Sequence, residues 1–207
     1  MVDVAFLMTG ALVGVSVAAP VGPMGMLCIN RTLSQGMAVG VSTGVGASTV
    51  QVSYCCILLL GLHEVGPWLE GHKQVLGLLS GLLLLAFAWR LLRGRRAQPG
   101  GQIVTRRSML AAYGTAVALN VFNPLSVMLL LAAIAATVGP TPPLGMDVVL
   151  LLGGLFVGSV LWWFCLSGAA ALLRSRLDAK LLGLVNIAAG VALALSGVLT
   201  LVRTVHS

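Results

Sequence analysis

The sequence predicts an all-α integral membrane protein of about six transmembrane helices, and three observations support that prediction. Of the 207 residues, 58% are hydrophobic and only 8% are charged, whereas a soluble domain usually has about 25% charged residues. The mean hydropathy is +1.05. The apolar residues form runs that do not alternate and can cross a hydrocarbon core of about 30 Å as helices, which satisfy their own backbone hydrogen bonds in lipid.

Basic residues separate the apolar runs rather than covering a soluble face. The net charge of +7 therefore indicates the positive-inside pattern of a membrane protein and not a nucleic-acid-binding surface. We expect six spans, at about 4–30, 37–62, 74–92, 108–137, 146–173 and 180–202. Ten of the 12 Lys and Arg residues, Arg31 among them, fall in the gaps after the first, third and fifth spans or at the span ends beside them. That side is predicted to be cytoplasmic, with both termini outside.

The gap after the third span divides the chain into two halves. Residues 94–107 predict a basic cytoplasmic linker between a first three-helix repeat, 1–93, and a second, 108–207, within one membrane domain. Pro20 and Pro124 each fall about 16 residues after the start of the first span of their half, and a proline inside a helix removes a hydrogen bond and clashes with the preceding turn. Because three is odd, the halves have opposite orientations. This predicts inverted repeats whose first and fourth helices are broken near the midplane.

The first candidate site is the break in the first span. Pro20, Gly22 and Pro23, followed by Met24, stand in an apolar run that they cannot continue as a regular helix. A half-helix that begins near Pro23 presents free backbone N–H groups and a partial positive charge, which suit a substrate carboxylate. A packing kink without a ligand is the alternative interpretation.

Polar residues of three other spans are candidates for the same site. Asn120 and Asn123 precede Pro124 in the fourth span, where they either bind substrate or cap the broken helix. Gln51 is costly in lipid unless it is paired, which makes it a candidate for a cavity wall. Trp162 is unusual within a span, since tryptophan prefers the membrane interface. It either lines a cavity or packs against core and lipid.

The predicted spans hold no deep carboxylate and no clearly buried Lys or Arg. This favours a substrate without net charge, such as a zwitterion. No catalytic motif or nucleotide-binding loop is present, so we expect neither an enzyme nor a cofactor, and transport that is secondary. The cysteines are Cys28, Cys55, Cys56 and Cys165. They lack metal-site spacing, and we interpret them as small apolar packing residues.

Four short motifs follow one another in order along nearly the whole chain. They are Pro20-Val21-Gly22-Pro23 in the first span, Asn120-Val121-Phe122-Asn123-Pro124 in the fourth, Gly158-Ser159-Val160-Leu161-Trp162-Trp163 in the fifth, and Asn186 with Gly190 in the sixth. Together they resemble the motifs of the LysE/RhtB family of bacterial amino-acid exporters. The resemblance implies a six-helix inverted-repeat fold and export of amino acids or related metabolites across the bacterial inner membrane, driven by an ion gradient. Gln51 stands where many relatives have an acidic residue, which leaves open whether H⁺ or Na⁺ is the coupling ion.

The leading hypothesis is a secondary exporter of an amino acid or similar small zwitterion that works by alternating access around the two breaks. The alternatives are an exporter of metal or other inorganic ions, a membrane thiol–disulfide conductor, and a non-transporting membrane subunit. The expected partners are the substrate, a coupling ion and the lipid bilayer, with no nucleic acid. Glycine-rich faces in the second, fifth and sixth spans permit either a homodimer or packing within one chain.

Overall fold

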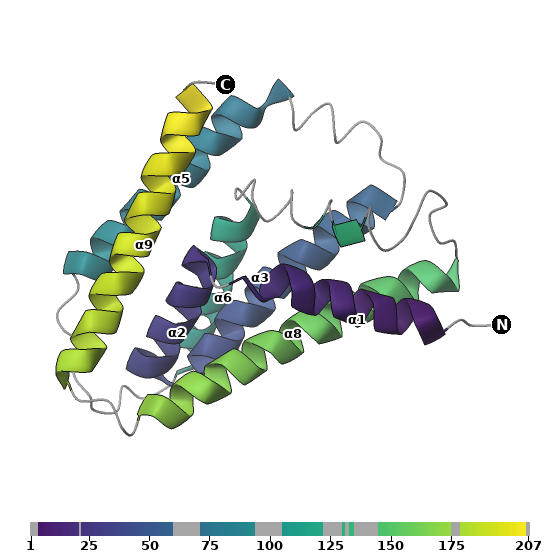
Figure 1. The fold of residues 1–207 in the computed structure, drawn as a ribbon, viewed down its shortest axis with the longest axis horizontal. Helices are drawn as coiled ribbons and strands as arrows, with labels where there is room; N and C mark the ends of the chain where they lie inside the picture. The colour runs from purple at the N-terminus through teal and green to yellow at the C-terminus, as the bar shows by residue number, and fades with distance from the viewer. Residues whose placement is uncertain are drawn as a thin grey trace.

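Helices are the secondary-structure elements of the described part of the chain, which has no strand (Figure 1). The computed structural model describes residues 4–20, 22–59, 71–93, 105–121, 130, 133–134, 145–174 and 179–205. Its helices are α1 (Val4–Ala18), α2 (Pro23–Gln35), α3 (Met37–Leu59), α5 (Lys73–Arg93), α6 (Arg106–Val121), α8 (Met146–Arg174) and α9 (Ala179–Val205).

Several of these helices have the length and composition of membrane spans. Three segments are long and apolar enough to cross a membrane, at Met37–Leu59, Met146–Leu173 and Ile187–Thr204. The bent pair α1–α2 makes a fourth if it is one span. The six spans in two inverted repeats remain a prediction, because much of the predicted fourth span lies outside the described residues.

Proline chemistry explains where the first span leaves helical geometry. Pro20 has no N–H to bond the carbonyl of Ser16, and α1 ends at Ala18. Pro23 stands in the first turn of α2, where its missing N–H removes nothing. The axes of α1 and α2 differ by 83°. A half-helix therefore begins inside the first apolar run.

The first span also extends further than its sequence pattern indicates. The sequence ends this span near residue 30 and places Arg31 in the following loop, whereas α2 continues to Gln35. Gly36 then makes the turn into α3 with φ at 104°, a left-handed conformation that favours glycine, and its N–H bonds the carbonyl of Thr32. Arg31 is consequently a helical residue, and its side chain is half-buried.

Glycines allow α1 and α8 to pack backbone to backbone. A Cβ at Gly10 would lie 2.1 Å from the Leu151 carbonyl oxygen, and one at Gly154 would lie 2.1 Å from that of Leu7. Gly10 meets Leu151 and Gly14 meets Leu155, four residues further along both helices, so the two helices are parallel, and Figure 1 shows them side by side. Such contact between small residues is a main way in which helices associate in lipid.

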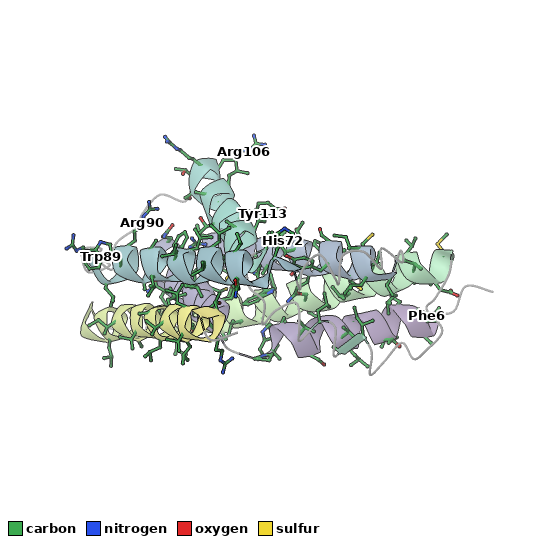
Figure 2. All side chains as sticks on the ribbon, turned by 90° about the horizontal axis from the view of Figure 1, so that it is seen from above. Phe6, His72, Trp89, Arg90, Arg106 and Tyr113 are labelled. Atoms are coloured by element: carbon green, nitrogen blue, oxygen red, sulfur yellow. The ribbon has the colours of Figure 1, made fainter. Side chains whose placement is uncertain are left out.

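Most of the other extensive helix contacts also join early and late parts of the chain. Helix α3 packs on α6 and α8, α5 packs on α9, and α2 packs on α3, α8 and α9. The α5–α9 pair is antiparallel, because Gly77 faces Thr204 and Gly190 faces Leu92. Figure 2 shows α6, marked by Arg106 and Tyr113, projecting from the layer that the longer helices form.

Basic residues lie at the ends of two helices. Helix α6 begins with Arg106 and Arg107, and the last turn of α5 holds Arg90 and Arg93. The Arg93 guanidinium lies 3.6 Å from the ring centre of Trp89, an exposed tryptophan. An exposed tryptophan beside arginines at a helix end is typical of a membrane–water interface. We refer to these helix ends, where α2, α5 and α8 finish and α3, α6 and α9 begin along the chain, collectively as the basic end.

Candidate functional site

The candidate site is centred on the break between α1 and α2. The Gly22 N–H bonds the Pro20 carbonyl oxygen at 2.8 Å, so it does not extend the hydrogen-bond ladder of α1. Gly22 is the N-cap of α2, and no side chain caps this helix. The N–H groups of Met24 and Gly25 belong to the first turn, which has no acceptor within its own helix. The start of α2 thus offers free donors and a partial positive charge inside the bundle.

Side chains from α3 and α8 form the walls around the break. Ala18, Cys28, Ala47 and Trp163 make one buried cluster, and the partly buried side chains packed on it include Met24 and Trp162. A Cβ at Gly44 would lie 2.2 Å from the Trp163 Cβ, so only a glycine in α3 admits this indole.

Both indoles carry a buried donor without a partner. Trp163 is only 3% exposed. Within the described residues, neither the Nε1 of Trp163 nor that of Trp162 donates a hydrogen bond, although both atoms are buried. A buried N–H without an acceptor costs about 1–3 kcal/mol. Two such groups on adjacent residues therefore call for an acceptor from water or a ligand.

A hydrogen-bonded cluster of α3 and α8 lies one to two turns from the break. We call Ser48, Gln51 and Ser159 the α3–α8 hydroxyl cluster. The Ser159 hydroxyl donates to the Gln51 Oε1 at 2.7 Å and lies 2.8 Å from the Ser48 Oγ. All three residues are buried. The side-chain oxygen of Gln51 therefore has its hydrogen-bond partner within the protein. This favours a role of Gln51 in joining α3 to α8 over direct contact with substrate.

The structure assigns the predicted site residues to different surroundings. Gly22, Pro23 and Met24 line the break, as does the partly buried Trp162, whereas the Pro20 ring is exposed. Asn120 is buried near the end of α6. Asn123 and Pro124 lie outside the described residues.

Two functional candidates were not predicted from the sequence. Trp163 is more deeply buried than Trp162, and sequence alone does not tell which of two adjacent tryptophans faces the bundle. Arg31 was expected in a loop. Its Nη1 instead donates to the Thr43 Oγ1 and to the Ala112 carbonyl oxygen, each at 3.0 Å. The signal available in the sequence is that neither glycine nor proline interrupts residues 26–35, so a helix can run through Arg31.

The cysteines have the surroundings of packing residues. All four are free. Cys28 donates from its Sγ to the Gly40 carbonyl oxygen at 3.4 Å and lies 3.4 Å from the Ser167 Oγ. Within the described residues, no group of three or more His, Cys, Asp or Glu side chains gathers as metal ligands do.

These features define a class of protein. Apolar helices of span length, packed through glycines around a broken helix with buried polar donors, are the architecture of a multi-pass membrane protein with an internal polar site.

The comparison with known proteins then gives the family. A family model described as LysE type translocator matches residues 15–204, and the chain belongs to that family. It is accordingly a membrane transporter. The chain is 28% identical over 191 residues to the "Putative amino acid efflux protein YcgF" of Bacillus subtilis (strain 168), and the alignment covers 90% of each chain. No solved structure matches the chain.

Proposed function

We propose that this protein is a secondary transporter that exports an amino acid, or a similar small zwitterionic metabolite, across the bacterial inner membrane by alternating access. The family match and the relative named for amino acid efflux support export and the substrate class. The observation that carries the proposed binding site is the partnerless, buried indole N–H of Trp163 beside the uncapped start of α2.

The substrate carboxylate binds beside the start of α2 and the two tryptophans of α8. The α2 N-terminus and the two indole N–H groups are all donors, and a carboxylate accepts several hydrogen bonds at once. The single acidic residue among those described, Asp147, begins α8 and stands 15 residues before Trp162, which is about 22 Å along the helix. A carboxylate at the break therefore meets no described like charge.

The substrate ammonium binds at the end of α1. The Ser16 carbonyl has no helical donor, because residue 20 is a proline. The N–H that would bond the Ala18 carbonyl belongs to Gly22 and bonds the Pro20 carbonyl instead. These oxygens carry the partial negative charge of a helix C-terminus, which attracts a cation. The broken helix thus offers one end to each charge of a zwitterion.

Alternating access follows from two inverted repeats, 1–93 and 108–207, joined by the basic linker 94–107. The helix contacts support this arrangement. Exchanging the two halves converts the α1–α8 pair into the α6–α3 pair, and both pairs are parallel, since Gly46 meets Tyr113 while Tyr54 bonds Val121. The same exchange converts α3–α8 and α5–α9 into themselves, and both are antiparallel, as a two-fold axis in the membrane plane requires.

Sidedness follows from the distribution of charge. The basic end faces the cytoplasm, and both termini lie outside. Helices α1, α5, α8 and α9 carry most of the exposed large apolar side chains, which lipid covers. The coupling ion is H⁺ or Na⁺, and the observed contacts favour neither.

Counterflow in liposomes tests the proposal. The purified chain is reconstituted alone, and radiolabelled amino acids are screened for exchange. We expect counterflow of at least one amino acid and a reduction of at least about tenfold in Trp163→Phe, which keeps most of the ring but removes the donor. Phe164→Leu is the matched control, because Phe164 is exposed on the same helix. Counterflow by Trp163→Phe at the wild-type rate would refute the proposed site, and no counterflow of any amino acid would refute the proposed substrate class.

A further inference from the structure

Arg31 is the residue whose structural position differs most from its sequence interpretation. It lies in the third turn of α2 and bridges three helices, because its Nη1 donates to the Thr43 Oγ1 of α3 and to the Ala112 carbonyl oxygen of α6. Each of these hydrogen bonds is 3.0 Å long. In the halves described above, Arg31 and Thr43 belong to the first and Ala112 to the second.

Neither acceptor balances the charge of the guanidinium. A hydroxyl and a backbone carbonyl are neutral, and no carboxylate of the described residues pairs with Arg31. Asp147, the acidic residue of the described chain, stands at the opposite end of α8 from Ser167. Ser167 lies at the level of Arg31, since its Oγ and that of Thr32 both approach Gly40. A half-buried charge without a counter-charge is costly and commonly marks a functional site in a membrane protein.

The hydrogen bonds of Arg31 leave one edge of its guanidinium free. Both leave from Nη1, and within the described residues Nε and Nη2 donate none. Those two nitrogens form the planar fork that matches the two oxygens of a carboxylate. What Arg31 lacks is therefore a bidentate anion and not a further neutral acceptor.

The position of Arg31 relates this free edge to the transport path. It bonds the Ala112 carbonyl of α6, a helix that begins with the exposed Arg106 and Arg107, and Figure 2 shows Arg106 at the projecting start of α6. It also stands eight residues after Pro23 on the same helix, which is about 12 Å. A substrate at the break is thus about two helical turns from Arg31.

We propose that Arg31 is the cytoplasmic docking residue for the carboxylate of the transported amino acid, which it binds through the Nε–Nη2 edge before the substrate moves along α2 to Trp163. This inference rests on the proposed function and extends it. The substrate then meets donors at both ends of α2. Arg31 is specific for a carboxylate, whereas the break recognises both charges of the zwitterion.

The test compares the transported amino acid with its α-amide, which keeps the ammonium and the side chain but has no carboxylate. Inside-out vesicles containing the full chain expose the basic end. There the half-saturation concentration is measured for the amino acid, and the inhibition constant for the amide. In Arg31→Gln we expect the value for the amino acid to rise about 10–100-fold and that for the amide to change less than about twofold. Arg31→Lys keeps the charge but loses the fork, so it is expected to fall between wild type and Arg31→Gln.

Two controls separate docking from general effects of charge. Arg107→Gln removes a charge from an exposed position at the same end and should leave both constants unchanged. Half-saturation from the opposite side of the membrane should change little in Arg31→Gln. If Arg31 binds a lipid phosphate instead, both compounds are affected equally and the effect follows the fraction of anionic lipid, which overturns the inference.

The outcomes also separate this inference from the proposed function. If wild-type protein binds and transports no amino acid, the proposed function fails and this inference fails with it. If wild type transports an amino acid and both Arg31 variants discriminate against the amide as wild type does, only the docking role is overturned. If Arg31→Gln does not fold, Arg31→Lys and the wild-type preference for the amino acid over its amide still decide, and equal affinity for the two compounds rejects the inference.

Discussion

Adjacent glycines of α8 provide a direct test of the helix packing, because only one of them faces α1. A Cβ at Gly154 would lie 2.1 Å from the Leu7 carbonyl oxygen and 2.9 Å from the Ala11 nitrogen, whereas a Cβ at Gly153 meets nothing within 4 Å. Real Cβ atoms essentially never approach other atoms closer than 3.0 Å. Gly154→Ala must therefore move α1 away from α8 by about 1 Å, which loses roughly a quarter to a half of the dispersion energy at each separated contact.

We expect Gly154→Ala to lower the free energy of unfolding by about 1–3 kcal/mol, the usual cost of overpacking. Gly153→Ala should leave it unchanged or raise it by up to about 1 kcal/mol, since alanine favours helix over glycine. Unfolding in mixed micelles of increasing SDS content, followed by tryptophan fluorescence, measures both variants. Equal stabilities for the two variants would show that α1 does not lie where the structure places it.

Two more packing predictions can be measured with the same assay. Ser159→Ala breaks the α3–α8 hydroxyl cluster and should cost about 0.6–1.7 kcal/mol, the range found for hydrogen bonds between membrane helices, while Ser53→Ala removes only a bond to its own exposed helix and should cost less. Gly81→Ala should destabilise the α5–α9 pair by about 1–3 kcal/mol. The new Cβ would lie 3.1 Å from the Gly197 carbonyl oxygen and closer still to a leucine side chain. Gly183→Ala is the control and should not destabilise the pair, because a Cβ there meets nothing within 4 Å.

The class of this fold is readable from sequence because it depends on composition and run length. Helices in lipid must bond their own backbones, so 58% hydrophobic residues in long runs leave few alternatives. The end of α1 and the start of α2 have local causes as well. Pro20 lacks the N–H that would continue α1, and Pro23 suits the first turn of α2. Such features need no knowledge of the neighbouring helices.

The partners of polar side chains could not be predicted in this way. Gln51 bonds Ser159, which is 108 residues away in the chain, and Arg31 bonds a carbonyl 81 residues away. Whether Gln51 lines a cavity or joins two helices depends on that distant partner. Likewise, Trp163 is buried because Gly44 of another helix makes room for it. Hydropathy and motif spacing contain no information on these pairings, which arise only when the helices pack.

The contact between α1 and α8 has a consequence for biosynthesis. The glycine face of α1 is complete once Gly14 has been made, but its partner surface around Gly154 follows about 140 residues later. At about 5–20 residues per second, that interval is roughly 7–30 s. During this time the first helix is in the membrane with carbonyls and small side chains facing lipid or the insertion machinery. The nascent protein therefore reaches its final arrangement only after its fifth apolar run has been inserted, and a chain released before then has no surface on which α1 can dock.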